Sequence, residues 1–501
     1  MGRGVGFVVL LAMSVCACGD GGNSKTPMKA VGGAGGAGNS SGSSSTGGQP
    51  SITGGAPAQD AACGLASAAY CETFEDGPVT PEARGGDLDE ARISAARLAP
   101  LQMADGDQIN WIGPATIPLC RDGVGPSVWP PEDTLICQPN TQVGSGHLLT
   151  AVAAQNYGLN SFRILQPFDF ADRTGTIVFD ADLSMPNGLF GWASIEITDE
   201  PIPAPSFTNY ERGPLPRNAI QIHFDYDRCS GKTAVGHALT YDDYVATELK
   251  NDLGEFPPCI VTEKDSLNRA QIRLSQTKVE VYASDFSEDG LTFAKPQLIF
   301  SAPLSLNFTR GWVHFTTRNH ATIKYGFGDS WTIRWDNIGF DGPKLSAGRE
   351  YQIPDSSTPA QSKEGKDGVN MGYRLAEAPG GMLTCCPTTA VPSLTFEDVD
   401  LTGVKKATLA FNSYYLNNVA PVVGFTLLYS FNGGEFIERP MTEGEVKAIT
   451  TELALGSMAQ TIDVPLSALV DGTNTLEFYT RNVPLNYPPS ISNIDLILTT
   501  E

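Results

Sequence analysis

The chain has 501 residues, of which 41% are hydrophobic and 18% charged, and 33 Lys and Arg stand against 56 Asp and Glu, a formal net charge of −23. This length predicts two or three domains, and the apolar fraction is enough for hydrophobic cores, which excludes disorder throughout the chain. The negative charge excludes a basic nucleic-acid-binding protein, because phosphate groups would be repelled.

The N-terminus has the pattern of an export signal. Arg3 precedes an apolar run, Val5–Val15, which is too short to span a bilayer and is typical of a signal peptide. Residues 15–19 (VCACG) then resemble the lipobox of bacterial lipoproteins. The resemblance implies a signal peptide over residues 1–17 and an acylated Cys18. The alternative is an ordinary secretory peptide cut nearby.

Residues 18–62 are expected to form a disordered tether, because they are rich in Gly and Ser and show no apolar periodicity. A coil of this length has a root-mean-square reach of roughly 35–40 Å. No later apolar run reaches the roughly 18 residues of a membrane span, so we expect contact with the membrane through the lipid anchor only. Gly19 follows the acylated cysteine, and by resemblance to lipoprotein sorting this implies the outer membrane of the cell envelope.

Eight cysteines remain after the export signal, and an even number in an exported chain favours disulfides. Neighbours along the sequence suggest the pairs Cys63–Cys71, Cys120–Cys137 and Cys229–Cys259. Cys385 and Cys386 are adjacent, and a disulfide between them would be strained because their Cα atoms lie only about 3.8 Å apart. They could form that bridge, stay as two thiols, or bond to two separate partners.

Residues 63–345 predict an all-β sandwich. Alternating runs are frequent, as in the pattern of Ile220, Ile222 and Phe224 on one face with Gln221, His223 and Asp225 opposite. A period of two places one face in the core and the other in solvent. Many such strands, separated by Gly, Pro, Asn and Asp turns, indicate two packed sheets. Two short helices are expected outside them, over Asp89–Leu98 and Tyr241–Lys250.

Residues 346–501 predict a second, smaller β-sandwich. Its expected strands are Lys406–Phe411, Val422–Ser430, Gln460–Val464 and Thr475–Thr480. Turns are expected at residues 432–434 (NGG) and 471–472 (DG), and one helix is expected over Met441–Leu453. The fold class is therefore all-β, with two sandwich domains after the signal peptide and linker.

Both units resemble known jelly rolls. The first opens with residues 71–77 (CETFEDG) and closes with residues 331–342 (WTIRWDNIGFDG), a pairing that resembles the concanavalin A-like lectins and glucanases. That resemblance implies that the first and last strands pair side by side. The second unit, with residues 429–436 (YSFNGGEF) and 470–478 (VDGTNTLEF), is similar to galactose-binding-like jelly rolls and carbohydrate-binding modules.

The resemblance also supplies an enzyme hypothesis. Retaining glucanases of the concanavalin-like class carry E-x-D-x-E on one strand, and Glu196 and Glu200 match the outer positions while Thr198 takes the place of the Asp. Two carboxylates are what double displacement requires. The alternative is a solvated strand face that leads into a proline-rich loop. Motifs of other nucleophilic enzymes are absent from the sequence, and His314 and His320 are expected to flank a turn.

A sugar-binding face is the second hypothesis, because sugars bind aromatic planes and planar polar side chains. The candidate residues are Trp111, Trp192 and Trp312 for stacking, with His223, Asp225, Arg273, Tyr282, His314 and Arg334 for hydrogen bonds. The alternative is an ordinary polar sheet surface with the tryptophans in the core.

A structural calcium ion is implied by the same resemblance. Glu75, Asp76 and Asp336 lie near the first and last strands, and Glu397, Asp398 and Asp495 repeat this placement in the second unit. Calcium needs several oxygen ligands.

The sequence as a whole predicts a lipid-anchored envelope protein that recognises a polysaccharide or glycoconjugate without catalysis. The alternatives are a glycoside hydrolase or lyase that uses Glu196 and Glu200, and a structural or adhesion protein that binds another protein. The sequence does not give the oligomeric state.

Overall fold

The computed structural model describes residues 63–76, 88–98, 134–137, 146–153, 159–184, 191–205, 214–225, 232–254, 258–263, 266–319, 330–353, 373–377, 394–416, 426–451, 455–481 and 490–500. Several predictions fall outside these residues. They concern the signal peptide, the lipidated Cys18, the tether, Trp111, His320, Cys120, Cys229, Cys385 and Cys386.

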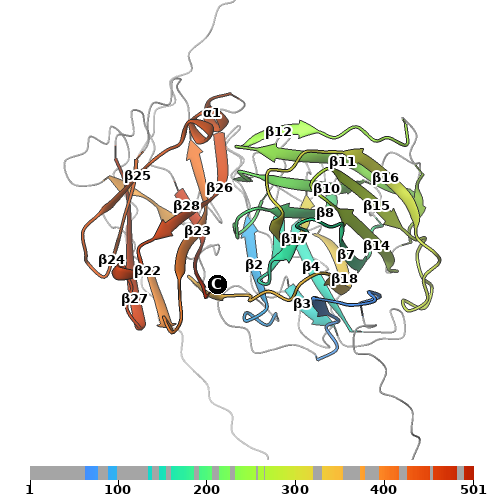
Figure 1. Ribbon diagram of the computed structural model, residues 1–501, viewed down its shortest axis with the longest axis horizontal. Helices are drawn as coiled ribbons and strands as arrows, with labels where there is room; N and C mark the ends of the chain where they lie inside the picture. Colours follow the sequence, from blue (N-terminus) through green and yellow to red (C-terminus); the bar gives the residue numbers. More distant parts are fainter. Residues whose placement is uncertain are drawn as a thin grey trace, which may run out of the picture. The chain divides into compact units, whose positions relative to one another are not determined.

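The first β-sandwich contains an eight-stranded antiparallel sheet, which Figure 1 shows together with its neighbour. In spatial order its strands are β16 (Gln297–Pro303), β15 (Lys278–Ala283), β14 (Asn268–Leu274), β7 (Gly175–Ala181), β18 (Ser330–Phe340), β4 (His147–Ala153) and β3 (Thr134–Cys137), and β1 (Tyr70–Glu72) also pairs with β18.

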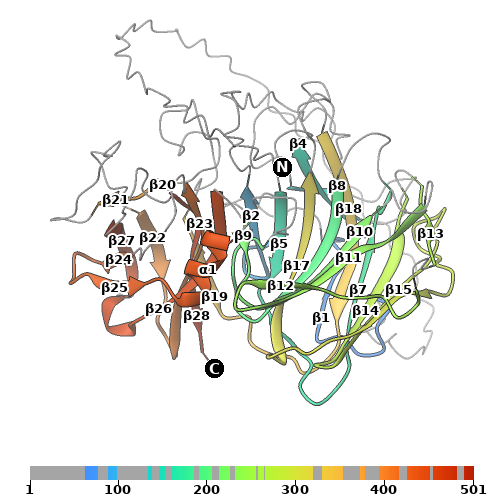
Figure 2. The same cartoon turned by 90° about the horizontal axis from the view of Figure 1, so that it is seen from above.

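A nine-stranded sheet forms the other layer of this sandwich (Figure 2). Its order is β12 (Val245–Glu248), β11 (Lys232–Asp242), β10 (Ala219–Asp225), β8 (Gly191–Thr198), β17 (Arg310–Asn319), β5 (Leu159–Ile164) and β2 (Ile93–Leu98), with β13 (Ile260–Val261) paired to β11 and β6 (Phe168–Asp169) to β17.

The two sheets enclose one hydrophobic core, to which the apolar faces of their strands contribute. At its centre Phe162 stacks on Phe315 with ring centroids 5.1 Å apart, and Trp335 lies edge-on to Phe315 at 5.5 Å. The indole N–H of Trp335 donates to Thr150 Oγ1 at 2.8 Å, so the buried polar atom of this large ring is satisfied.

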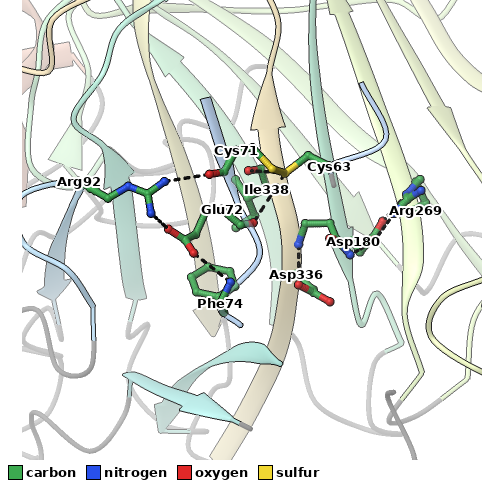
Figure 3. The surroundings of a disulfide bond; sticks show 10 residues. Cys63, Cys71, Glu72, Phe74, Arg92, Asp180, Arg269, Asp336 and Ile338 are labelled. Atoms are coloured by element: carbon green, nitrogen blue, oxygen red, sulfur yellow. Dashed lines mark hydrogen bonds and ion pairs between the residues drawn. A yellow bond between two sulfur atoms is a disulfide. The ribbon is translucent and has the colours of Figure 1, made fainter. Parts of the chain in front are cut away.

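The first and last strands of this sandwich lie side by side, which confirms the arrangement that the resemblance implies. Tyr70 of β1 pairs with Phe340 of β18, and Cys71 pairs with Gly339. The predicted disulfide Cys63–Cys71 is confirmed, with a Cα–Cα distance of 5.8 Å (Figure 3). Gly339 is required at this seam, because a Cβ there would lie 2.8 Å from the Tyr70 carbonyl oxygen and 3.0 Å from Cys63 Cβ. Cys259 is also disulfide-bonded.

The second sandwich has a six-stranded and a five-stranded sheet around its own core. The six-stranded sheet has the order β19 (Arg349–Gln352), β28 (Ser490–Thr499), β23 (Lys406–Leu416), β26 (Leu455–Val464) and β9 (Pro214–Leu215), with β20 (Tyr373–Arg374) paired to β28. The five-stranded sheet has the order β21 (Ala376–Glu377), β27 (Gly472–Arg481), β24 (Thr426–Phe431) and β25 (Ile437–Pro440), with β22 (Leu394–Val399) paired to β27.

The helix expected over residues 441–453 is confirmed as α1 (Glu443–Thr451), and a short 3-10 helix, η3, covers Leu466–Ala468. A capping box starts α1: the Thr442 hydroxyl accepts from the Glu445 N–H, and the Glu445 carboxylate accepts from the Thr442 N–H. Among the described residues, no helix has the length and apolar character that a bilayer crossing demands.

The two helices expected in the first sandwich are wrong. Residues 93–98 form β2, whose backbone pairs with β5, after a turn in which Asp89 accepts from Arg92 and Ile93. Residues 241–250 end β11, turn and form β12. Asp243 and Tyr244 adopt φ values of 45° and 69°, and two successive left-handed residues make the tight turn of a hairpin where a helix was expected.

Candidate functional site

The outer face of the nine-stranded sheet carries a row of polar side chains on four adjacent strands. Gln221 of β10 pairs with Glu196 of β8, Glu196 pairs with His314 of β17, and His314 pairs with Arg163 of β5. We call these four residues the polar row. The flanking Ile195 and Ile197 belong to the core. Because successive side chains of a strand alternate, Glu196 points away from that core.

The polar row is buried, with Gln221, Glu196 and His314 at 0% exposure and Arg163 at 1%. The expectation that this sheet has one face in solvent is therefore wrong. Part of the cover comes from the segment after β8, where Ala204 packs against Ala96 and Leu159. Glu350 of β19 covers Arg163 and accepts a hydrogen bond from Arg163 Nη2.

Glu196 lies among two hydroxyl groups and one guanidinium. Ser194 Oγ donates to its Oε1 at 2.5 Å, and Thr316 Oγ1 donates to its Oε2 at 2.8 Å. Burial raises the pKa of Glu196 to about 7, although both hydrogen bonds and the charge of Arg318 act in the opposite direction. Near neutral pH the carboxyl group is thus divided between its acid and its ionised form.

The histidines on this face are neutral at the same pH. Burial, together with the charge of Arg163, holds the pKa of His314 well below its usual value. Burial and the nearby His237 lower the pKa of His223 to about 3. Burial also lowers the pKa of Arg318 to about 10, which leaves it charged.

The tautomer of His314 follows from its contacts. Thr198 Oγ1 donates its single proton to the Glu200 carbonyl oxygen at 2.7 Å and lies 3.0 Å from His314 Nε2. His314 Nε2 must then carry the ring proton and donate it to Thr198, because a hydroxyl group has only one proton. His314 Nδ1 is left as an acceptor.

Four atoms of the polar row have no hydrogen-bond partner among the described residues. They are Nε of Arg163, Oε1 and Nε2 of Gln221 and Nδ1 of His314, all buried. An unmade hydrogen bond at a buried polar group costs about 1–3 kcal/mol. The polar row therefore offers three N–H donors and two acceptors for an additional group.

The structure does not bring the two predicted catalytic carboxylates together. Glu196 lies in β8, whereas Glu200 follows the end of that strand and its Oε2 accepts from Thr461 Oγ1 at 2.7 Å. The charged group that acts on the pKa of Glu196 is the Arg318 guanidinium, and no carboxylate does so. Pro201 follows Glu200 and the strand stops before it, so the E-x-T-x-E pattern does not continue on one face.

The predicted sugar-binding residues divide between the two sheets of the first sandwich. Trp192, His223, Asp225, Trp312 and His314 belong to strands β8, β10 and β17 of the nine-stranded sheet. His314 lies in the middle of β17, so the turn expected beside it is not there. The indole N–H of Trp312 donates to the Leu165 carbonyl oxygen at 3.2 Å.

Arg273, Tyr282 and Arg334 lie instead in β14, β15 and β18 of the eight-stranded sheet. The guanidinium of Arg273 covers the ring of Tyr282 at 4.6 Å from its centroid. This contact takes up one face of that ring. The candidate residues were to share a face only if their strands adjoin, and strand order separates these three from the others.

The predicted calcium ligands do not form a site. Among the described residues, no group of three or more His, Cys, Asp or Glu is placed to hold a metal ion. Glu75 Oε1 accepts from the Gly146 N–H at 3.0 Å, and Asp336 Oδ1 accepts from the Asn337 N–H at 2.7 Å. Asp180, beside Asp336, is bound by Arg269 (Figure 3), so a guanidinium neutralises the charge there. Asp76 is exposed.

Gln221 and Arg163 of the polar row were not among the predicted site residues, although the local pattern places each on the outer face of a strand. Gln221 shares the strand face of His223, and Arg163 lies between the core residues Phe162 and Ile164. A large polar residue between two buried apolar ones indicates the outer face of a strand. Nothing local indicates that the two lie in one row.

No protein-family model matches this sequence, and a search of curated proteins finds no match. Similar solved structures include the carbohydrate-binding module CBM66 from Bacillus subtilis, with 10% identity over 39% of this chain and 86% of that one and a TM-score of 0.22. A glycosyl hydrolase family 16 protein from Mycobacterium smegmatis has 11% identity over 55% and 100%, with a TM-score of 0.27. The VIP36 exoplasmic/lumenal domain in its Ca2+/Man3GlcNAc-bound form has 10% identity over 44% and 84%, with a TM-score of 0.24. At these values the likenesses do not identify a ligand for this chain.

Proposed function

We propose that the protein recognises a polysaccharide or glycoconjugate through the polar row and does not cleave it. The observation that carries this proposal is the set of buried, unpartnered atoms on Gln221 and His314. A saccharide hydroxyl group both donates and accepts hydrogen bonds. Hydroxyl groups of one sugar can therefore make the missing hydrogen bonds of an amide oxygen, an amide N–H and a ring nitrogen.

The geometry favours the end of a glycan chain over its middle. A chain bound along its length needs a groove that is open at both ends, whereas the polar row is buried throughout. Gln221 and His314 lie two strands apart, about 10 Å, with Glu196 between them. A terminal sugar that spans this distance would meet neutral groups on both sides, which favours an uncharged saccharide.

The placement of the carboxylates supports the proposed absence of cleavage. Hydrolysis of a glycosidic bond by the usual routes requires two carboxyl groups, one on each side of that bond. Glu196 has the raised pKa of an acid catalyst, which supports the glycoside hydrolase as the second candidate. Its predicted partner Glu200, however, is bound to Thr461.

The test combines binding with a stability measurement. The folded protein is applied to a panel of neutral β-glucans, galactans, mannans and chitin oligosaccharides, beside the variant Gln221→Leu. We expect binding by the unchanged protein, no release of reducing ends, and at least tenfold weaker binding by Gln221→Leu with an unchanged or higher melting temperature. The melting temperature should not fall, because leucine removes an unsatisfied buried amide.

A matched control is Gln271→Leu, on the outer face of the eight-stranded sheet, which should bind as the unchanged protein does. Equal binding by Gln221→Leu and Gln271→Leu would refute the site. Release of reducing ends that Glu196→Gln abolishes would establish the hydrolase instead.

We also propose that Cys18 is acylated and anchors the protein in the outer membrane of the cell envelope, on the strength of the sequence pattern around it. Cys18→Ala should move the protein from the membrane fraction to the soluble fraction of a Gram-negative host. Cys16→Ala is the control and should stay with the membrane. A Cys18→Ala protein that still sediments with membranes would exclude the lipid anchor.

A further inference from the structure

Two aromatic rings lie together on the outer face of the five-stranded sheet. Phe436, directly before β25, is 40% exposed, and it is the only aromatic residue among the large apolar side chains exposed in the described residues. Its ring meets that of Tyr479 in β27 at a right angle, with centroids 5.0 Å apart. In such a pair the ring that presents its edge keeps both of its faces free of its partner.

The sequence of β27 places these groups on the outer face. Leu476 and Phe478 of this strand belong to the core of the second sandwich. The alternate residues Glu477, Tyr479 and Arg481 therefore point away from it. They follow one another at intervals of about 7 Å along the strand. β24 lies between β27 and β25, and Leu428 of β24 pairs with Tyr479 on one side and with Glu438 of β25 on the other.

Planar polar groups surround the two rings. The Tyr479 hydroxyl donates to Glu477 Oε2 at 3.4 Å, and Arg481 forms an ion pair with Glu438. The two partners of this ion pair are 37% and 55% exposed, so both can reach a further group in solvent. The surface thus combines an aromatic centre with two carboxylates and one guanidinium at its edges.

We propose that this surface, defined by Phe436, Tyr479, Glu477, Glu438 and Arg481, is a second saccharide-binding site. The apolar face of a pyranose ring packs on an aromatic plane, while its equatorial hydroxyl groups point outward and reach the carboxylates and the guanidinium. Two carboxylates against one guanidinium disfavour an anionic glycan, so the occupant is a neutral saccharide. Because Phe436 and Glu438 are exposed, the surface is open to solvent on this side and takes an internal stretch of a chain.

This site shares only its ligand class with the polar row and lies in the other sandwich. A protein–protein interface fits the surface less well. Interfaces of that kind bury about 800 Å² on each partner around an apolar centre, whereas here two rings are bordered closely by charges.

The experiment is affinity electrophoresis of the full chain in gels that contain a soluble β-glucan, a galactan or a mannan. Phe436→Ala and Tyr479→Ala should each lower the retardation at least fivefold. Tyr479→Phe should keep most of it, because the ring remains and only the hydroxyl is lost. Leu291→Ala is the control, since Leu291 is 60% exposed and lies in the first sandwich.

Gln221→Leu in the same gels separates the two sites. If Phe436→Ala migrates as Leu291→Ala does while Gln221→Leu loses retardation, the second site is refuted and the polar row stands. If Phe436→Ala loses retardation and Gln221→Leu does not, the second site stands and the polar row is refuted as a saccharide site. An unchanged protein that no polysaccharide retards refutes both. Equal loss in Tyr479→Phe and Tyr479→Ala would show that the hydroxyl and not the ring makes the contact, which also overturns the proposal.

Discussion

Replacement of Arg163 by methionine should lower the free energy of unfolding by about 3–5 kcal/mol, the usual cost of leaving one partner of a buried ion pair alone. The side chains of Arg163 and Glu350 are 1% and 2% exposed, so the Glu350 carboxylate would stay buried without its cation. Methionine fills a similar volume, and the loss therefore reports charge and not a cavity.

The double variant Arg163→Met/Glu350→Met separates the charge from the packing. Two apolar side chains in place of a buried ion pair are often neutral or stabilising, so the double variant should recover most of the loss. Urea unfolding, followed by tryptophan fluorescence and by circular dichroism, measures both variants. A single variant within 1 kcal/mol of the unchanged protein would mean that solvent reaches Glu350, and that Arg163 does not seal the end of the polar row.

Local sequence patterns were sufficient for much of the fold. The alternation of Ile220, Ile222 and Phe224 places them in the core, because a period of two is a property of the strand itself. The Cys63–Cys71 pair was predictable for a similar reason, since only a short loop separates the two residues. The pairing of the two end strands required the family resemblance, because Tyr70 and Phe340 are far apart in the sequence.

Strand order was beyond these patterns, and it decides which residues share a site. His223 and Arg273 both lie on outer strand faces, yet β10 and β14 belong to different sheets. Conversely, Gln221 and His314 lie in one row because β8 lies between β10 and β17. Such neighbours depend on pairings between distant segments, which leave no periodic signal in either segment.

The burial of the outer face of the nine-stranded sheet could not be predicted from the sequence either. Alternation indicates that Glu196 and Ile195 point to opposite sides, but it does not say whether the polar side meets water. Ala204, in the loop after β8, covers part of the nine-stranded sheet. Glu350, in a strand of the other sandwich, covers Arg163. A carboxyl group that the sequence placed in solvent is for this reason fully buried.

That burial gives the second large effect, a pH-dependent stability difference between the unchanged protein and Glu196→Gln. The pKa of Glu196 is about 7 in the fold against 4.5 for the unperturbed group, so between these values the folded state binds a proton that the unfolded state does not. The free energy of unfolding of the unchanged protein, relative to the variant, should therefore fall by about 3 kcal/mol as the pH rises from 4.5 to 7. Below and above this window the difference should be level.

Glutamine suits the site as a substitute for the protonated acid, because its amide can donate to Thr316 Oγ1 while its oxygen accepts from Ser194. Glu280→Gln is the matched control, for which the pH-dependent stability difference should have the opposite sign. The hydrogen bond from Lys278 lowers the pKa of Glu280, so the unchanged protein gains stability over that variant as the pH rises through the acid range. Urea unfolding at pH 4, 5.5 and 8 measures both differences. If the Glu196→Gln difference does not change with pH, the carboxyl group titrates as it does in water, and solvent reaches Glu196, which contradicts the burial of the polar row.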